Sequence, residues 1–431
     1  MNLTKHYSPP GGVLFVTYGG AHIAKVAPVV FALRNQNIPC TVIALTLGYK
    51  KALQWGLCPL GYKNFMHLVD HTDQVMALGK KLLFGNQHPD VEEYESICYL
   101  GVNYMEWVQL YGEAEAEVRY LQGGRRHFLP INFFGQIIDY LKPNMVVSTS
   151  SPRSEQAAIV AASLRHIPTL TMMDLFALPY EVFHRHKVKA DRITVLSDFV
   201  KQNLVNGGTP PEIIHVTGCP SFDIHFETKI KQQAQLLRQT LGWNNLQVVM
   251  WAGNLEESGP EVDDRYIGTK LGITVETCLR EWINSRTDLA LIVRYHPSQY
   301  HLFQIFEPHQ RIYVSNPGCE SVEPLLHLAD TLVVQASTVG YEASMIGKRV
   351  LSLVFSPMVI NSGFNPARLG YAEAVCSPEN LIGQLETARP FLMKQHLLPP
   401  AGPATPRVIE HILCLLQAGR SLSTDTGQSG L

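Results

Sequence analysis

A glycine-rich junction near the start of the chain is the first place where residue types and spacing could do chemistry. The apolar run at residues 13–16 meets YGGAH at 18–22, and an apolar helical pattern follows. Glycines between a strand and a helix let a ligand approach the N–H groups of the helix N-terminus, and the pKa of a histidine suits a general base. We therefore expect Gly19, Gly20 and His22 to face a substrate. The alternatives are a plain tight turn and a histidine that caps its own helix.

A second candidate site lies in the segment TLVVQASTVGYEASM, which predicts a buried strand, small hydroxylated residues and then a helix from about Val339. Backbone N–H groups and two hydroxyls at the helix start would face an anion, which the helix dipole favours. We assign this role to Ser337, Thr338 and Gly340. Glu342, near the first turn, could accept two hydrogen bonds from a ribose diol. The alternative is a capping box, in which a hydroxyl caps the helix and the glutamate supports the cap.

Two other predicted strands of the second half end in residues suited to a nucleotide. VMWAG runs into Gly253 and Asn254, where the glycine would let a diphosphate approach the backbone; a plain turn is the alternative. LIVRYHP contains Arg294 and His296. A buried arginine is costly unless it is paired or liganded. His296 would meet the nucleotide or, alternatively, hold its own loop through a hydrogen bond.

Charged residues follow two predicted strands of the first half. Arg153 comes after VVSTSS and Asp174 after TLTMM. Exposed in a cleft, they would meet sugar hydroxyls or a charged acceptor, with Arg153 on the sugar nucleotide and Asp174 as a candidate catalytic carboxylate. They could instead pair with each other.

These residues need a scaffold, and apolar β-branched runs alternate with helical patterns along the chain. Continuous apolar strands separated by helices predict parallel sheets covered on both faces. Strands are expected at 12–18, 40–47, 65–69, 145–150, 169–175 and 192–197, and then at 246–253, 290–296, 311–316, 331–337 and 349–354. Helices are expected at 23–35, 155–165, 275–285 and 320–329. The fold class is therefore α/β, with two doubly wound, Rossmann-like domains facing a cleft.

The pattern predicts where the domains begin and end. Residues 1–218 form an acceptor-side domain, and an aromatic and charged segment at about 71–140 reads as a helical insertion in which acceptor specificity could reside. Residues 219–385 form a nucleotide-sugar domain after the turn-rich VTGCPSFD. A proline-rich linker and a helix from Pro406 or Arg407 occupy 386–420, and 421–431 are expected to be disordered.

Composition narrows the class of protein. The 431 residues are 46% hydrophobic and 17% charged with a formal net charge of −2, so we expect a globular protein without a nucleic-acid partner. Eight scattered cysteines show no zinc-finger spacing and are expected to be reduced thiols rather than disulfides. The sequence shows neither a signal peptide nor an apolar run long enough to span a membrane. A cytoplasmic location is expected.

Together, these motifs resemble GT-B-fold proteins of the branch that holds UDP-GlcNAc 2-epimerases and bacterial surface-polysaccharide glycosyltransferases. SDFVKQNLVNGGTPPEIIHVTGCPSFD is similar to the epimerase stretch that ends in V-T-G-N-P-x-x-D, with Cys219 in place of the asparagine. HPSQ resembles the His-Pro loop of the group, and QASTVGYEASMIGKRVL its phosphate- and ribose-binding element. TYGGAH is similar to the Gly-Gly-x-His turn of the peptidoglycan GlcNAc transferase. The likeness spans most of residues 12–385.

The resemblance implies roles for individual residues. Ser337 and Thr338 would hold the donor diphosphate, and Glu342 the ribose. His296 would lie on the nucleotide side of the cleft, and the turn at 19–22 would face the transferred sugar or the acceptor.

One departure separates two possible reactions. The epimerases carry an aspartate for proton transfer at C2, whereas Ser148 and Thr149 stand here and no carboxylate is expected to replace them nearby. Asp174 stands about where the epimerases carry a glutamate. Removing and returning a proton needs suitable acid–base groups, so a transferase is favoured.

The sequence thus predicts a glycosyltransferase that uses a nucleotide-activated sugar donor and a glycan, lipid-linked or other acceptor in bacterial glycoconjugate or surface-polysaccharide synthesis. No cofactor and no metal are expected, because helix N-termini can stabilise the leaving diphosphate and VDDRY lacks the D-x-D pattern. Peripheral membrane association and a homodimer are compatible with such an enzyme. The alternatives are a UDP-GlcNAc 2-epimerase-like enzyme and a non-catalytic sugar-nucleotide-binding protein.

Overall fold

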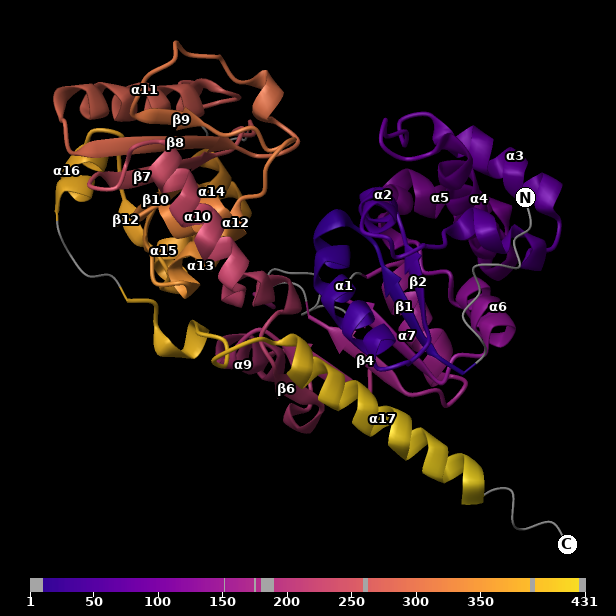
Figure 1. Cartoon of the computed structure of the whole chain (residues 1–431). Helices are drawn as coiled ribbons and strands as arrows, with labels where there is room; N and C mark the ends of the chain where they lie inside the picture. Colours follow the sequence, from indigo (N-terminus) through magenta and orange to yellow (C-terminus); the bar gives the residue numbers. More distant parts are fainter. Residues whose placement is uncertain are drawn as a thin grey trace, which may run out of the picture. The chain divides into compact units, whose positions relative to one another are not determined.

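Two six-stranded parallel sheets form the framework of the chain, one in each of two units (Figure 1). The computed structural model describes residues 11–150, 152–173, 176–179, 190–258, 263–387 and 392–425. The first unit comprises residues 1–221 and 399–431, and the second comprises residues 222–398. The predicted α/β class with Rossmann-like sheets is confirmed.

The first sheet has the strand order β2-β1-β3-β4-β5-β6. Its strands are β1 (Val13–Thr17), β2 (Cys40–Ala44), β3 (Met145–Thr149), β4 (Thr169–Met172), β5 (Arg192–Val195) and β6 (Ile214–Val216). Every residue of β1 and β3 is buried, because helices cover both faces of a parallel sheet. In the register of this sheet, Val16 lies opposite Ser148, so β1 and β3 end side by side.

Helices of the first unit include α1 (Gly20–Asn35), α2 (Leu47–Gln54), α7 (Ser154–Ser163), α9 (Asp198–Asn206) and α17 (Thr405–Asp425), with a short 3₁₀ turn η4 (Pro211–Ile213). One core cluster joins one face of the sheet to α1 and α17, through Phe15, Val26 and Ile412 among others. The returning C-terminal helix therefore belongs to the core of the first unit.

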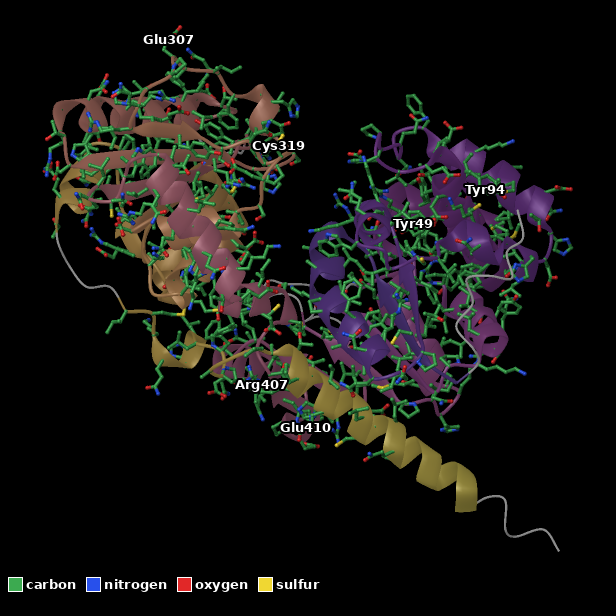
Figure 2. All side chains as sticks on the ribbon, in the orientation of Figure 1. Tyr49, Tyr94, Glu307, Cys319, Arg407 and Glu410 are labelled. Atoms are coloured by element: carbon green, nitrogen blue, oxygen red, sulfur yellow. The ribbon has the colours of Figure 1, made fainter. Side chains whose placement is uncertain are left out.

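The start of α17 is fastened by Arg407, which is labelled in Figure 2. Its Nε atom donates to the Thr217 carbonyl at 2.8 Å, and its guanidinium also reaches the carbonyls of Ala401 and Gly402. The helix runs to Asp425, beyond residue 420 where the sequence places its end, because no proline follows Leu416. The remainder of the predicted disordered tail, 426–431, lies outside the described residues.

Helical elements fill the segment between β2 and β3: η2 (Tyr62–Leu68), α3 (Thr72–Leu83), α4 (Glu93–Tyr111), α5 (Glu113–Gly123), η3 (Gly124–His127) and α6 (Ile131–Leu141). The strand predicted at 65–69 is wrong, because these residues lie in the 3₁₀ helix η2 and the turn after it. The carboxylate of Glu95 accepts the N–H groups of Tyr62 and Lys63 at 2.8 and 3.0 Å, which holds the first turn of η2. Burial of Phe65 and Met66 accounts for the apolar run.

The second sheet has the order β12-β11-β10-β7-β8-β9. Its strands are β7 (Gln247–Gly253), β8 (Leu289–Tyr295), β9 (Ile312–Val314), β10 (Thr331–Val334), β11 (Arg349–Leu353) and β12 (Glu373–Val375). The sequence did not indicate β12, because three residues are too few to show a pattern. Val249, Leu291 and Val333 lie on the face that packs against α11 (Lys270–Ser285) and α16 (Asn380–Glu386).

The remaining elements of the second unit are η5 (Pro220–Phe226), which begins at its boundary, α10 (Thr228–Thr240), η6 (Tyr300–Leu302), α12 (Glu323–Leu328), α13 (Thr338–Met345), α14 (Pro357–Ser362), α15 (Pro366–Leu369) and η7 (Gln395–Leu397). The second unit extends past the predicted end at 385 because η7 packs on it. Leu397 is fully buried, and its carbonyl accepts the Tyr341 hydroxyl at 2.6 Å.

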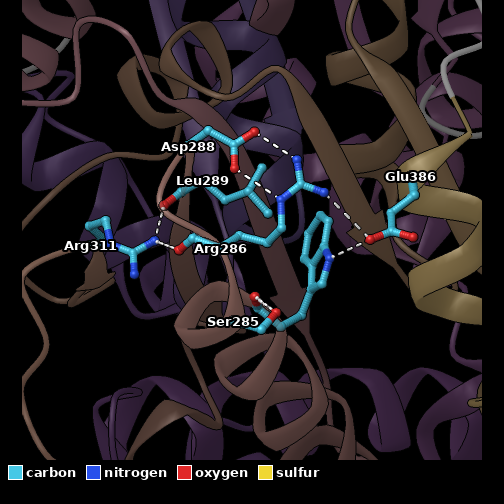
Figure 3. Close-up of polar contacts among 7 residues, drawn as sticks. Ser285, Arg286, Asp288, Leu289, Arg311 and Glu386 are labelled. Atoms are coloured by element: carbon cyan, nitrogen blue, oxygen red, sulfur yellow. Dashed lines mark hydrogen bonds and ion pairs between the residues drawn. The ribbon is translucent and has the colours of Figure 1, made fainter.

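Polar contacts fix the connection from α11 to β8 in the second unit (Figure 3). Two nitrogens of Arg286 contact the carboxylate of Asp288 at 3.0 and 2.7 Å, and a third lies 3.6 Å from Glu386. Arg311 donates to the Leu289 carbonyl at 3.0 Å. These exposed pairs define the loop and contribute little to stability.

Each sheet contains one point where the chain reverses its direction of travel across the sheet. In the first sheet this point lies between β1 and β3, and in the second between β7 and β10. Ligands of open α/β sheets bind beyond the carboxyl ends of the strands at such points. The residues that follow these four strands are therefore the first to consider as a site.

Candidate functional site

The points where the chain reverses its direction across each sheet are called switch points here. The glycine turn after β1 leaves open space at the first of them, between β1 and β3. Gly19 is extended, with φ −132°, and a Cβ atom on Gly19 or Gly20 would have no neighbour closer than 4.0 Å. Neither a left-handed backbone nor tight packing therefore requires glycine at these two positions. The space above them remains available to a ligand.

His22 lies on the first turn of α1 and is held by the last residue of β3 and by a residue of α7. Its Nδ1 atom lies 2.9 Å from Oε1 of Glu155 and 2.7 Å from Oγ1 of Thr149. Glu155, on the first turn of α7, has a fully buried side chain, whereas 19% of the His22 side chain is exposed. The N-cap residue of α1 is Gly19, and the Nδ1 atom of His22 is directed to β3 and α7.

The Glu155 carboxylate determines the tautomer of the histidine. Its Oε1 atom also accepts the Thr149 hydroxyl and the N–H of Tyr18, the latter at 3.0 Å. A carboxylate can only accept, so the Nδ1 atom of His22 carries the proton and Nε2 is the basic nitrogen of the neutral ring. This is the orientation that a buried carboxylate gives to an acid–base histidine.

This arrangement corrects one expectation from the sequence. Neither Ser148 nor Thr149 at the end of the strand is a carboxylate. Helix α7 nevertheless places one beside them, because Glu155 accepts the Thr149 hydroxyl. The other oxygen of Glu155, Oε2, is buried without a hydrogen bond to any residue that the structure describes. Asp174, the predicted catalytic carboxylate, lies outside the described residues.

Arg153 lies next to this group rather than within it. Its guanidinium carbon sits 4.0 Å from the centre of the Tyr18 ring, which is a cation–π contact. Arg153 makes no ion pair with any carboxylate in the described part of the chain. A positive charge is thus available beside the glycine turn.

At the second switch point, the buried Gln335 joins the ends of β7 and β10. Its Oε1 atom accepts the N–H of Asn254 at 2.7 Å, and its Nε2 atom donates to the Asn254 carbonyl at 3.1 Å. Nε2 also donates to Glu256, whose carboxylate accepts the Ser356 hydroxyl and the N–H of Met358 at the start of α14. Burial raises the pKa of Glu256. The backbone of Asn254 is thus part of a fixed polar network.

The loop after β10 begins α13 in a way that the sequence partly anticipates. Ser337 is the N-cap, and its hydroxyl accepts the N–H of Val339 at 3.4 Å, while its carbonyl accepts the N–H of Gly340 at 3.2 Å. Glu342 does not support this cap. Its Oε2 atom instead lies 3.2 Å from Nε2 of His225, so the predicted alternative of a capping box is wrong.

His225 and His327 form a chain of hydrogen bonds with Glu342. His225 is buried, and its Nδ1 atom lies 3.4 Å from Nε2 of His327. If His225 donates to the carboxylate, its Nδ1 atom accepts the proton of His327. Burial and the nearby His225 lower the pKa of His327 to about 4, which keeps it neutral. The buried His225 therefore holds the Glu342 side chain, which is 19% exposed at the surface of the second unit.

The remaining predicted residues have structural surroundings of their own. A Cβ atom on Gly253 would lie 2.7 Å from Tyr295 and 2.8 Å from Trp251, so packing requires this glycine. His296 is exposed, and its Nδ1 atom lies 2.8 Å from the Ser298 hydroxyl, so it holds its own loop. Arg294 is buried and donates to the Ser315 hydroxyl at 2.6 Å. Burial lowers its pKa.

No metal centre is indicated among the residues described, since they contain no group of three or more His, Cys, Asp or Glu side chains placed to hold an ion. None of the eight cysteines, which all lie in the described residues, forms a disulfide. Within the same residues, no helix is both long enough and apolar enough to cross a bilayer.

Sequence reasoning missed Glu155 as the partner of His22, and it missed His225 and Gln335 altogether. Glu155 follows Ser154 at the start of a helix, where an acidic residue normally reads as favourable to the helix dipole. His225 and Glu342 are 117 positions apart, and no local pattern links them. Only the carboxyl-edge position of Gln335 could have served as a signal.

In sequence comparisons, no protein-family model and no curated protein matches the chain. Solved structures do match it. The UDP-GlcNAc 2-epimerase from Neisseria meningitidis, bound to UDP-GlcNAc, superposes with a TM-score of 0.52 at 14% identity, covering 93% of this chain and 99% of that one. The Methanocaldococcus jannaschii UDP-GlcNAc 2-epimerase gives 0.55 at 16% identity with the same coverages.

A polymerase is also similar. The wall teichoic acid polymerase TagF matches with a TM-score of 0.53 at 11% identity, covering 96% of this chain and 91% of that one. At these identities the likeness concerns the fold. The chain shares the GT-B fold of these structures, which confirms the fold that the sequence motifs predict.

Proposed function

We propose that the protein is a glycosyltransferase that moves a sugar from a nucleotide-activated donor to a hydroxyl group of an acceptor. The observation that carries the proposal is the pairing of His22 with buried Glu155 beside the open turn at Gly19 and Gly20. A base with a fixed tautomer stands where a ligand can approach, at the switch point of the first sheet.

In the proposed reaction, His22 acts as the general base. Its Nε2 atom takes the proton of the acceptor hydroxyl as that oxygen bonds to the anomeric carbon of the sugar. The bond from the anomeric carbon to the diphosphate oxygen breaks, and the nucleoside diphosphate leaves with the electron pair. Glu155 stabilises the imidazolium that forms and keeps the ring in place.

The second unit supplies the proposed donor site. Glu342 would accept hydrogen bonds from the ribose, and the start of α13 at Ser337 and Thr338 would face the diphosphate. The N-terminus of a helix can stabilise the charge that develops on a leaving group. Because the similar Neisseria structure is bound to UDP-GlcNAc, a uridine diphosphate sugar is the first donor to test.

A second candidate is a sugar-nucleotide 2-epimerase, and one observation favours it. The carboxylate of Glu155 bonds to Thr149, near the point where the resemblance places an epimerase aspartate. A carboxylate and a histidine together could remove and return a proton at C2 of the sugar.

One experiment separates the candidates. The protein is incubated with UDP-GlcNAc in deuterated water, without an acceptor and then with candidate glycan and lipid-linked acceptors. A transferase releases UDP only when an acceptor is present. An epimerase incorporates deuterium at C2 without one and yields UDP-ManNAc, or ManNAc and UDP if water also cleaves the bond to the diphosphate. If the protein binds sugar nucleotides but does neither with any donor, a non-catalytic binding protein replaces both proposals.

A further inference from the structure

A cavity of the first unit lies between the end of β1 and the inserted helices. It has a volume of about 210 Å³, and its lining includes Tyr18, Leu47, Tyr99, Leu100 and Arg125. Every lining residue belongs to the first unit. The cavity is thus a feature of that unit alone.

Tyr99, one of the lining residues, carries a polar group without a hydrogen-bond partner. The residue is only 8% exposed, and its hydroxyl has no hydrogen-bond partner among the described residues. The ring is fixed by edge contacts with Tyr62 and Phe128, at centroid distances of 5.2 and 6.0 Å. A buried hydroxyl without a partner is unfavourable, so an occupant that accepts its hydrogen bond would remove that penalty.

One arginine lines the cavity, and a second lies next to a lining residue. Arg125 is part of the lining, and Arg153 stacks on the ring of the lining residue Tyr18. Neither guanidinium forms an ion pair with a carboxylate in the residues that the structure describes. Burial raises the pKa of the Tyr99 hydroxyl well above its usual value, while the charges of Arg153 and Arg125 act in the opposite direction. Both guanidinium charges therefore act electrostatically on the Tyr99 hydroxyl.

The one carboxylate among the lining residues, Glu95, already accepts hydrogen bonds from the backbone. The two oxygens of Glu95 accept the N–H groups of Tyr62 and Lys63, so they are directed to η2. Burial also raises the pKa of Glu95. The remaining lining is largely apolar, through Leu47 and Leu100 among others.

Tyr18 joins this cavity to the His22 site. Its ring lines the cavity, and its N–H donates to the same Glu155 oxygen that His22 contacts. We propose that the cavity is an acceptor-binding pocket that takes an anionic group, a phosphate or a carboxylate, attached to an apolar or ring-shaped body. Arg125, Arg153 and the Tyr99 hydroxyl hold the anion, and the apolar lining holds the body. This assignment of the acceptor class rests on the proposed transferase function.

The test measures binding of small probes to the full chain by titration calorimetry. Phenyl phosphate and benzoate carry the two anions on a ring, and phenol is the neutral control. At least one anion is expected to bind at millimolar concentration, and phenol is not. The stronger of the two anions shows whether the acceptor carries a phosphate or a carboxylate.

Matched variants locate the binding. Arg125→Gln should weaken it by about tenfold or more, as expected for loss of a hydrogen bond to a charged group, whereas Arg126→Gln, at the exposed neighbouring arginine, should not. Tyr99→Phe should weaken binding without lowering the melting temperature. Tyr94→Phe, on the same helix but exposed (Figure 2), should leave binding unchanged.

Three results would overturn the pocket: no binding of either anion, equal binding of phenol, or equal losses in the Arg125 and Arg126 variants. A Glu342→Gln variant separates this outcome from failure of the proposed function. It should retain the affinity for the anion probe while losing affinity for nucleotide, because the two sites lie in different units.

Discussion

The Nδ1 atom of His22 and the Oε1 atom of Glu155 lie 2.9 Å apart, although 133 residues separate them in the chain. Helix α1 brings the histidine to the carboxyl edge of the first sheet, and helix α7 brings the carboxylate. Because Thr149 and the N–H of Tyr18 bond to the same oxygen, the carboxylate cannot turn away. A buried, fully oriented acid beside a partly exposed histidine is an arrangement suited to proton transfer.

The first prediction concerns this pair. His22→Ala should lower turnover by about a hundredfold or more with little change in donor affinity, because general base catalysis acts in the transition state. Glu155→Gln should lower turnover as well, since an amide can stabilise neither the same tautomer nor the imidazolium. The measurement is steady-state kinetics on an identified acceptor. Near-normal turnover of the His22 variant would give the glycine turn a purely structural role.

The second prediction concerns the ribose. Glu342→Gln should weaken binding of a nucleoside diphosphate by about 1.5–3 kcal/mol, because a hydrogen bond to a charged acceptor is lost. The same variant should bind the 2′,3′-dideoxy nucleotide as well as the native protein does. His225→Gln, which removes the ring bonded to Glu342 at 3.2 Å, should have a smaller effect in the same direction. Equal losses for the ribose and dideoxy nucleotides would remove Glu342 from the ribose site.

The third prediction compares two glycines. Gly253→Ala should destabilise the protein by about 1–3 kcal/mol, since the added carbon would lie within 2.8 Å of two aromatic rings. Gly20→Ala meets nothing closer than 4.0 Å and should leave stability unchanged or raise it by about 0.4–1 kcal/mol. Turnover should nevertheless fall in the Gly20 variant. Urea unfolding and kinetics of the two variants check both statements.

The fourth prediction concerns a buried carboxylate in the insertion. Glu106 is buried, and its two oxygens accept the N–H groups of Asn132 and Phe133 at 2.9 and 3.2 Å, at the start of α6. Glu106→Gln should destabilise the protein by about 1–3 kcal/mol, because one N–H would lose its acceptor. Glu115→Gln, at an exposed pair with Arg119, is the control and should change little. Equal unfolding midpoints of the two variants would contradict the assignment.

The fifth prediction concerns acid stability of the first unit. Burial, then the neighbouring His411, Arg192 and Lys201, lower the pKa of His215 from 6.5 to about 4. The unfolded chain therefore binds this proton at a higher pH than the folded chain. The resulting stability is present above about pH 6.5 and is lost as the pH falls through about 4. The ring centroids of His215 on β6 and His411 on α17 lie 4.2 Å apart.

Comparing the native protein with His215→Gln isolates this contribution, because other groups titrate in both. The free energy of unfolding should fall more steeply in the native protein between about pH 7 and about pH 5 than in the variant. If the free energy of unfolding falls equally steeply with pH in both proteins, His215 does not control the acid stability.

Much of the framework could be predicted from the sequence, because parallel strands are long continuous apolar runs. Every residue of β1 and β8 is buried, and both strands are recognisable in the sequence as largely apolar runs. The run at 65–69 misled because η2 buries Phe65 and Met66 against the insertion. Apolar content alone does not distinguish a short buried strand from a buried 3₁₀ helix.

The site was only partly predictable, for a different physical reason. His22 could be found because the glycines beside it form a local pattern. The contacts of Glu155 with His22 and of His225 with Glu342 depend on how distant elements meet, which no local pattern encodes. The Tyr99 hydroxyl was equally invisible, because the lack of a hydrogen-bond partner is a property of the folded chain.

The central claim is that the protein uses a nucleotide-activated sugar, and the most direct test is the thermal midpoint of the full chain with a panel of nucleotides. The panel contains the diphosphates of uridine, cytidine, guanosine, adenosine and thymidine and their common diphospho-sugars. At a hundredfold excess over its dissociation constant, a true ligand should stabilise the folded state by about 2.7 kcal/mol and raise the midpoint. If no member of the panel raises the midpoint at millimolar concentration, the use of a nucleotide-activated sugar is contradicted.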